Sequence, residues 1–180
     1  MVRFLEKNEY ASTIPLFIEC FGDDPEFMEE YYGTVNADGA VQGRIRNGHV
    51  AVLEEEGKIL SMVHIRYYDA ELFFGSGSLH LQVPYLMGIC TDPACRHRGY
   101  MDQVMAFVLD QMMYEGHPWC FLIPVDKEIY RHLDFIYEWK LTEEEQEMLY
   151  ADEGLDTALA RLLNAERFPE GEIRIRKELS

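Results

Sequence analysis

The sequence has no long hydrophobic run and few positive charges. No apolar stretch approaches the ~18 residues that a membrane-spanning helix needs, and the first ten residues are too charged for a targeting segment. Sixteen Lys and Arg stand against 33 Asp and Glu, which gives a formal charge of −17. This shortage of cations argues against binding to nucleic acid or to an anionic membrane. The acidity would attract a cationic partner, although a role in solubility explains it equally well.

Paired cysteines and metal-binding histidine patterns are also missing. The four cysteines form no C-x-x-C pair, and the six histidines show neither H-x-x-x-H nor H-E-x-x-H spacing. Because the N-terminus carries no secretory or lipidation signal, we expect reduced thiols in a cytoplasmic protein, and no bound metal. The 180 residues, 48% of them hydrophobic, suffice for one well-buried domain.

Between residues 79 and 112 the hydrophobic pattern changes its period. Up to residue 90, apolar and polar side chains alternate, which predicts a half-buried strand. From Met101 onward, apolar residues recur with helical spacing at Val104, Met105, Val108, Leu109 and Met112. The sequence therefore predicts a strand, a connecting turn and an amphipathic helix.

The connecting turn is basic in an otherwise acidic chain, with Arg96, His97, Arg98 and Gly99 in succession. A helix N-terminus carries unpaired backbone N–H groups and a partial positive charge, so it attracts anions. The two arginines add charge, and a glycine lets ligand oxygens approach the backbone or allows a positive φ. This pattern predicts an anion-binding turn, although a solvated basic loop is the commoner explanation of such residues.

The remaining chain is expected to complete a mixed α/β domain. Further strands are predicted near residues 2–5, 49–53, 59–68, 119–123, 136–141 and 173–176. The strand at 119–123 should be parallel to the strand at 79–90, because a helix crosses between them. Two short helices are predicted before residue 33, the first ending at Gly22 and the second capped by Asp24.

Two helical patterns are found after residue 141. Thr142 and Glu145 form a capping box, which predicts the start of a helix. A helical stripe is predicted from the spacing of Leu155, Leu159, Leu162 and Leu163. We expect this stripe to be buried, either on the domain or across a dimer.

Three segments resemble a known family. Residues 96–101, R-H-R-G-Y-M, resemble the acyl-CoA-binding signature (Q/R)-x-x-G-x-(G/A) of the GCN5-related N-acetyltransferases, or GNAT enzymes. Residues 88–93 are similar to their G-V-x-T-x-P run, and residues 129–135 resemble a later I-Y-x-x-x-G-F segment. The nearest subgroup is that of the enhanced-intracellular-survival acetyltransferases of mycobacteria. Met101 and Asp134 depart from the pattern, which has a small residue and a glycine there.

The resemblance implies the GNAT acyl-CoA N-acyltransferase fold, an α/β (α+β) fold with a mixed, mostly antiparallel sheet flanked by helices. Residues 1–141 would form the acetyltransferase domain, and residues 142–180 a helix and strand that complete it or make an oligomer contact. The implied reaction moves an acetyl group from the co-substrate acetyl-CoA to a primary amine of a small-molecule or peptide acceptor. The residues implied to bind the coenzyme are Ile89, Cys90, Thr91, Arg96, His97, Arg98, Gly99, Tyr100 and Met101.

Within this scheme, backbone groups of Ile89 and Thr91 hold the pantetheine arm, and residues 96–101 hold the pyrophosphate. Tyr130 falls where the family places a tyrosine that protonates the coenzyme A thiolate, and a phenol with a pKa near 10 suits that role. Its alternative role is that of a helix tyrosine packed on the core. His80 is a candidate general base, but a lone strand histidine is more often structural.

Two other functions compete with acetyl transfer. One is a catalytically weak acyl-CoA-binding or regulatory module on the same fold, which Met101, Asp134 and the lack of an assigned base suggest. The other is a protein-interaction domain that uses the acidic surface and the leucine stripe. We expect no nucleic-acid or membrane partner in any of these cases, and a homo-oligomer is possible.

Overall fold

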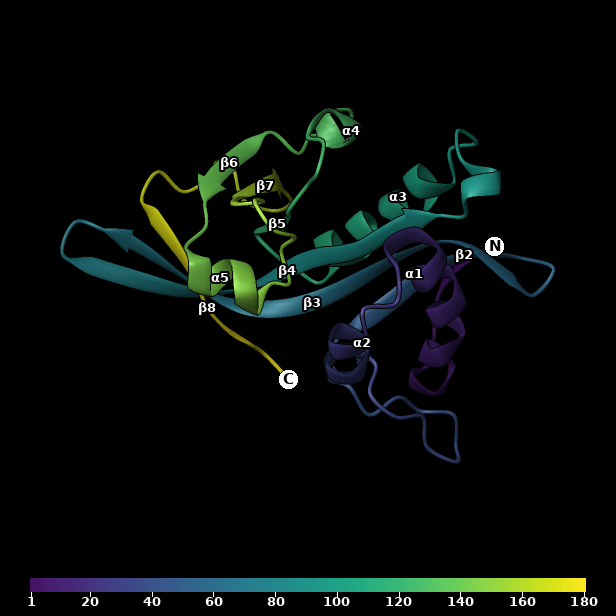
Figure 1. Cartoon of the computed structure of the whole chain (residues 1–180). Helices are drawn as coiled ribbons and strands as arrows, with labels where there is room; N and C mark the ends of the chain where they lie inside the picture. The colour runs from purple at the N-terminus through teal and green to yellow at the C-terminus, as the bar shows by residue number, and fades with distance from the viewer. The chain divides into compact units, whose positions relative to one another are not determined.

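The computed structural model describes all 180 residues. Its eight strands form one sheet in the order β1-β2-β3-β4-β5-β7-β6, and β8 pairs with β3 (Figure 1). The strands are β1 (Val2–Phe4), β2 (His49–Glu55), β3 (Lys58–Phe74), β4 (Gly77–Thr91), β5 (Trp119–Leu122), β6 (Tyr137–Lys140), β7 (Thr157–Leu162) and β8 (Glu172–Glu178). This mixed, mostly antiparallel sheet with its flanking helices confirms the predicted fold class.

The chain divides into two compact units. The first comprises Met1–Arg66 and Met87–Gln111, and the second comprises Tyr67–Leu86 and Met112–Ser180. None of the helices is long and apolar enough to cross a membrane.

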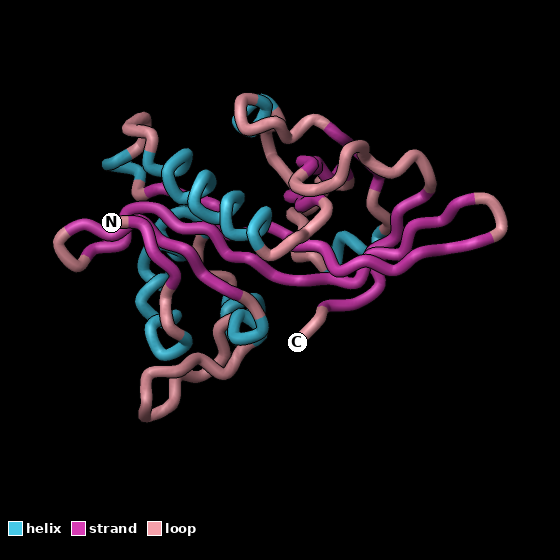
Figure 2. The backbone as a smooth tube through the Cα atoms, turned by 180° about the vertical axis from the view of Figure 1, so that it is seen from behind, coloured by secondary structure: helices cyan, strands magenta, loops and turns pink.

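In the first unit, helices cover both faces of β1, β2 and the first half of β3 (Figures 1 and 2). On one face, the ring of Phe4 lies 5.0 Å from that of Phe107 in α3 (Tyr100–Tyr114). On the other face, the ring of His64 lies 6.3 Å from that of Phe17 in α1 (Ile14–Phe21). Since both faces are covered, Val50, Ala51 and Val52 of β2 are all fully buried instead of alternating with exposed residues.

Local sequence signals determine where these helices begin and end. Pro15 occupies the first turn of α1, and Gly22 ends that helix with a φ of 90°. Asp24 caps α2 (Pro25–Tyr31), because its carboxylate accepts the N–H of Phe27 at 2.9 Å. In α3, the predicted apolar stripe is buried, namely Val104, Met105, Val108, Leu109 and Met112. The predictions for these three helices are confirmed.

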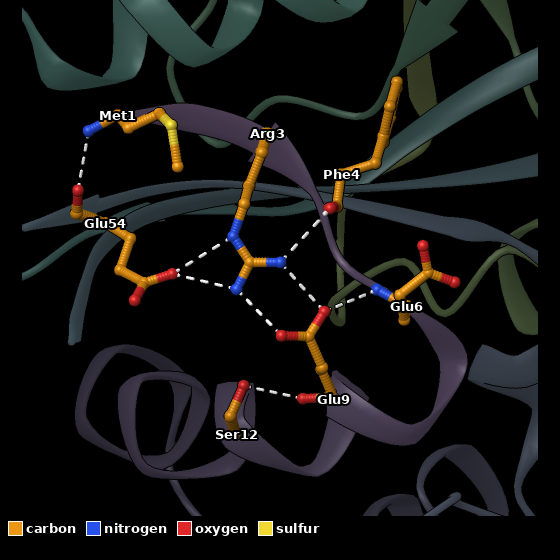
Figure 3. Close-up of polar contacts among 7 residues, drawn as sticks. All are labelled: Met1, Arg3, Phe4, Glu6, Glu9, Ser12 and Glu54. Carbon is orange, nitrogen blue, oxygen red and sulfur yellow. Dashed lines mark hydrogen bonds and ion pairs between the residues drawn. The ribbon is translucent and has the colours of Figure 1, made fainter.

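The guanidinium of Arg3 ties β1 to its neighbours (Figure 3). It contacts the carboxylate of Glu9, in the 3₁₀-helix η1 (Lys7–Thr13), at 2.8 Å and that of Glu54, in β2, at 2.9 Å. The hydrogen bond from Arg3, followed by one from the backbone N–H of Glu6, lowers the pKa of Glu9 to about 2. Two carboxylates from distant segments thus share one cation, which fixes the first strand against β2.

The second unit contains the parallel strand pair. Tyr85 of β4 pairs with Phe121 of β5 in parallel, as predicted from the crossover helix. Helix α5 (Glu143–Met148) begins with the predicted capping box of Thr142 and Glu145. The other carboxylate oxygen of Glu145 accepts the N–H of Ile175 at 2.6 Å, which joins α5 to β8.

The predicted leucine helix is wrong, because Thr157–Leu162 is strand β7. This strand lies between β5 and β6 and pairs antiparallel with both. Ala158, Leu159 and Ala160 are fully buried, so consecutive side chains on both faces of the strand are apolar. A central strand of this kind lacks alternation, and its Ala and Leu residues also suit a helix, so tertiary pairing overrode local preference.

Aromatic rings fill one face of β5, β7 and β6. We call this group the Trp119 cluster, and its members are Trp119, Phe121, Tyr137, Trp139 and Phe168. The rings of Trp119 and Trp139 meet edge to face at 5.7 Å. In the strand register, Ala160 stands opposite Phe121 and Tyr137 and Ala158 opposite Trp139, and these small side chains leave room for the rings.

Candidate functional site

The basic turn, which we define as residues 96–99, follows the end of β4 in the first unit. Its approach is fixed by Asp92, whose N–H donates to the carbonyl of Leu60 at 2.8 Å. One carboxylate oxygen of Asp92 accepts the N–H of Ala94 at 2.9 Å, and the other accepts the ammonium of Lys58. These bonds, that from Lys58 foremost, hold the pKa of Asp92 below its usual value. The carboxylate of Asp92 is therefore already compensated by a cation.

The backbone of the basic turn is left-handed at two of its four residues. His97 and Gly99 have positive φ values, 62° and 73°, and Arg98 between them does not. The carbonyl of Gly99 accepts the N–H of Gln103 at 3.2 Å as α3 begins. A Cβ at Gly99 would meet no atom within 4 Å, so the space beside this backbone is open. Turns that mix handedness at a helix start direct successive N–H groups toward an anion.

The side chains of Arg96, His97 and Arg98 are exposed. Arg96 is also fixed in place, because its Nε donates to the carbonyl of Thr91 at 3.3 Å. Tyr100 is half-buried, and its hydroxyl donates to the carboxylate of Glu55 at 3.2 Å. Met101, in the first turn of α3, is half-buried as well. The structure thus brings all six residues of the resembled signature together around one helix start.

The strand segment before the turn packs its central side chain into the core. Cys90 is buried, whereas Ile89 and Thr91 are half-buried. Burial, and secondarily the thiol of Cys20, raises the pKa of the Cys90 thiol, so it stays protonated at neutral pH. Ser61 donates its hydroxyl proton to the carbonyl of Cys90 at 3.0 Å. The side chain of Cys90 therefore serves only in packing.

Tyr130 belongs to the second unit, in the short helix α4 (Glu128–Arg131). It is half-buried, and its ring meets that of Phe135 edge to face at 6.2 Å. Asp134, which stands where the family pattern has glycine, has a φ of 62°. Aspartate is among the few residues that adopt this left-handed conformation without large strain. The departure at Asp134 therefore keeps the backbone geometry that a glycine would serve.

His80 lies in the second unit, where it takes part in an exposed charge cluster. Its Nδ1 is 2.9 Å from a carboxylate oxygen of Asp69, and its Nε2 is 3.6 Å from one of Glu71. Glu71 also accepts a hydrogen bond from Arg176 of β8, and this bond lowers the pKa of its carboxyl. A histidine in such surroundings has a structural explanation. No group of three or more His, Cys, Asp or Glu side chains is arranged to hold a metal ion.

The first unit also contains a buried histidine, which no motif in the sequence indicates. His64 of β3 is 1% exposed, and its Nδ1 lies 2.8 Å from the hydroxyl of Tyr31. Burial, followed by the charge of Arg66, lowers the pKa of His64 to about 3. Its Nε2 has no hydrogen-bond partner. We call this group the His64 cluster, and its members are Phe17, Phe27, Tyr31, Tyr32 and His64.

The His64 cluster lies against an irregular point of β4. Gly88 has a φ of 57°, and a Cβ built on it would be 3.1 Å from Cγ and Nδ1 of His64. A glycine suits this position, because a Cβ would press on the ring and a side-chain-bearing residue is strained at this φ. The sequence indicates this buried polar group only through the pair His64 and Arg66, two polar residues at alternate positions of an apolar strand.

A family model described as "Acetyltransferase (GNAT) domain" matches residues 1–138. No curated protein sequence matches the chain. Among solved structures, a GNAT family acetyltransferase from Brucella melitensis in complex with acetyl-CoA is 16% identical, with a TM-score of 0.60. That match covers 96% of this chain and 93% of the other.

Two longer proteins are also similar. Eis1 from Mycobacterium abscessus is 16% identical, with a TM-score of 0.54 over 78% of this chain. A probable N-acyltransferase from Enterococcus faecalis is 14% identical, with a TM-score of 0.58 over 77% of this chain. The chain spans 33% of the length of each of these two structures. At such identities, the likeness to all three structures shows a common fold.

Proposed function

Because the chain belongs to the GNAT acetyltransferase family, as the match over residues 1–138 shows, we propose that it transfers an acetyl group from acetyl-CoA to a primary amine. Family and fold support acyltransferase activity. The observation that carries the finer proposal is the basic turn, with its two exposed arginines and its left-handed backbone at the start of α3. Acetyl-CoA in the Brucella melitensis structure supports the choice of donor.

In this proposal, the donor is held by two adjoining segments of the first unit. The pyrophosphate binds the backbone N–H groups of residues 96–101, and Arg96 and Arg98 add charge-assisted hydrogen bonds. The pantetheine arm lies along residues 89–91, where it pairs with backbone groups of Ile89 and Thr91. The side chains of His97 and Tyr100 flank the phosphates.

Transfer also needs proton movements. The amine loses a proton as its nitrogen attacks the thioester carbon, and the departing thiolate gains one. We assign the second step to the hydroxyl of Tyr130, on the resemblance of residues 129–135 to the family segment. The acceptor is a small molecule or peptide with a primary amine. The net charge of −17 favours a cationic acceptor through long-range attraction.

The likeness to Eis1 supports a place near the enhanced-intracellular-survival subgroup. In the family, the first two helices line the acceptor side. Here α2 bears the exposed Glu26 and Glu29, and Glu30, whose carboxylate pairs with Arg44 at 2.8 Å. The carboxylates of Glu26 and Glu29 suit an ammonium group at the entrance.

Calorimetric titration with acetyl-CoA tests donor binding. Replacing Arg96 and Arg98 by Ala removes charge-assisted contacts worth ~1.5–3 kcal/mol each, so affinity should fall by an order of magnitude or more. Arg46→Ala is the matched control, because Arg46 is an exposed arginine of the same unit outside the turn. Unchanged binding in a folded double variant rules out the basic turn as the donor site.

Release of free thiol from acetyl-CoA in the presence of a panel of primary amines tests transfer itself. Amine-dependent release by the wild-type protein is expected. If acetyl-CoA binds but no amine stimulates release, the proposal of transfer is wrong and the protein is an acyl-CoA-binding module.

A further inference from the structure

The unpaired Nε2 of His64 points to a ligand. The side chain is 1% exposed, so water does not reach it freely, and Nε2 has no hydrogen-bond partner. A buried donor or acceptor without a partner is costly, and native proteins keep few of them. Three aromatic rings, those of Phe17, Tyr31 and Tyr32, contact the imidazole, and none of them offers a polar contact to Nε2. A bound molecule that reached Nε2 would remove this cost.

Tyr31 decides which nitrogen of His64 carries the proton. A phenol is a good donor and a neutral imidazole nitrogen a good acceptor, so the 2.8 Å contact favours the tautomer in which Tyr31 donates its proton to Nδ1. A neutral imidazole has one N–H, and it is then on Nε2. The ring is also held in orientation, at 9° to the ring of Tyr31 and at 27° to that of Phe17. His64 thus presents a fixed, uncharged N–H donor.

The place of this donor follows from Gly88. The imidazole ring lies against the Gly88 backbone, since a Cβ there would be 3.1 Å from Cγ and Nδ1 and 3.4 Å from Cε1, the ring atom that joins Nδ1 to Nε2. Gly88 immediately precedes residues 89–91, along which the proposed pantetheine arm runs from the basic turn. Residues 89–91 span about 10 Å of strand, and in the proposed arrangement the thioester end of the arm lies at the Gly88 end of this segment.

We propose that His64 is a catalytic residue whose Nε2–H donates a hydrogen bond to the thioester carbonyl oxygen of bound acetyl-CoA, and that Tyr31 is a positioning residue that fixes the tautomer. This inference rests on the proposed function. As the amine nitrogen bonds to the carbonyl carbon, the C=O π electrons move to the oxygen, and they return when the C–S bond breaks. A preorganised neutral donor stabilises the intervening oxyanion. His64 itself neither gains nor loses a proton.

The carbonyl carbon of the donor reports directly on this hydrogen bond. We would bind acetyl-CoA labelled with ¹³C at the carbonyl to the full-length protein and record its chemical shift. In the wild type the bound resonance should move downfield of free acetyl-CoA, because a hydrogen bond withdraws electron density from the carbonyl. In His64→Phe, which keeps an aromatic ring, this shift should disappear while acetyl-CoA still binds. With an amine that supports thiol release, kcat should fall by roughly 10²–10³.

Two amide variants separate this role from packing. The amide nitrogen of His64→Gln reaches about as far as Nε2, whereas that of His64→Asn reaches only the Nδ1 position. Gln should therefore restore part of the shift and of kcat, and Asn should not, although Asn can still bond with Tyr31. Tyr31→Phe should reduce the shift, because it removes the group that holds the proton on Nε2.

The outcomes are distinct. If wild-type protein does not bind acetyl-CoA, the proposed function fails. If acetyl-CoA binds and its carbonyl resonance is the same in the wild type and in His64→Phe, or if Asn restores kcat as well as Gln does, the role of His64 is structural and this inference is wrong.

Discussion

The two units contain buried aromatic clusters of similar size but different chemistry. The His64 cluster includes an imidazole with an unpaired nitrogen and a phenol bonded to it, and the buried Arg66 lies two residues along the strand from the imidazole. The Trp119 cluster also has unpaired nitrogens, the indole N–H groups of Trp119 and Trp139. Its rings contact one another, as those of the His64 cluster do, and alanines of β7 stand opposite Phe121, Tyr137 and Trp139 in the strand register. An unpaired polar atom alone therefore does not indicate a site.

The difference lies in what each cluster contacts. The imidazole of His64 has a partner that fixes its proton, and it lies against a glycine in a left-handed conformation beside the proposed donor segment. The indoles are held by edge-to-face ring contacts, which stabilise the fold. We therefore expect changes in the Trp119 cluster to lower stability, and changes in the His64 cluster to alter the chemistry.

Tyr130 is the one residue of the second unit to which we assign a chemical step. Its substitution should have the largest effect, because it removes the proton donor for the departing thiolate. Tyr130→Phe keeps the ring and removes the proton, and turnover should fall by roughly 10²–10⁴ with acetyl-CoA affinity unchanged. Tyr137→Phe is the control, because that tyrosine stacks on Phe168 within the Trp119 cluster. Steady-state rates and calorimetry decide, and near-normal turnover would leave Tyr130 with only its packing role against Phe135.

Substitutions in the Trp119 cluster should lower the stability of the protein without altering its chemistry. Trp119 is 1% exposed, and Trp119→Ala should lower the free energy of unfolding by ~3–5 kcal/mol through lost burial and a cavity. Denaturant titration measures this, and Trp119→Phe should cost less because an aromatic ring remains. A loss below about 1 kcal/mol in Trp119→Ala would contradict the packing assigned to this cluster.

A substitution at Gly88 tests the packing of the His64 cluster in the first unit. Gly88→Ala combines a left-handed backbone with overpacking against His64, so we expect a loss of about 2–3 kcal/mol in unfolding free energy. Gly57→Ala is matched, because Gly57 has a φ of 78° but nothing within 4 Å of a new Cβ. It should lose only the backbone part, about 1–2 kcal/mol. Equal losses of unfolding free energy in the two variants would show that the His64 ring moves aside without loss of stability.

The Arg3 group of Figure 3 should give the smallest effect, and one that depends on pH. The pKa of Glu9 is about 2 in the folded protein, below the ~4.3 of an unfolded chain, so its stabilisation is complete above that unfolded value. It is lost as the pH falls through the folded value. Glu9 is about a third exposed, so solvent screening limits its contribution to about 1 kcal/mol or less.

Comparing Glu9→Gln with the wild type by thermal melts between pH 7 and pH 3 measures this contribution. The difference should shrink toward acid pH. A difference that stayed constant over this range would mean that the Glu9 carboxylate has no lowered pKa.

The sequence predicted those features whose cause is local. The cap at Asp24, the capping box of Thr142 and Glu145, and the basic turn with α3 all depend on residues within a few positions of one another. Strand β7 was misassigned because its identity depends on pairing with β5, some forty residues earlier in the chain. The residues of β7 are compatible with either a helix or a strand.

The same distinction holds for the site. The donor-binding segment is contiguous, so motif and spacing suffice to propose it. The His64 cluster joins α1, α2, β3 and β4, and no local pattern predicts that Tyr31, His64 and Gly88 meet. The only sequence signal was two polar residues in an apolar strand, which shows an anomaly but does not show what it contacts.

Hydrogen–deuterium exchange with and without acetyl-CoA tests the central claim most directly. The account predicts slower exchange of backbone amides in residues 89–91 and 96–101 when acetyl-CoA is added, because these N–H groups bond the pantetheine arm and the pyrophosphate. Arg96→Ala with Arg98→Ala should weaken that protection at the same ligand concentration. Binding of acetyl-CoA that left exchange in both segments unchanged would contradict the account.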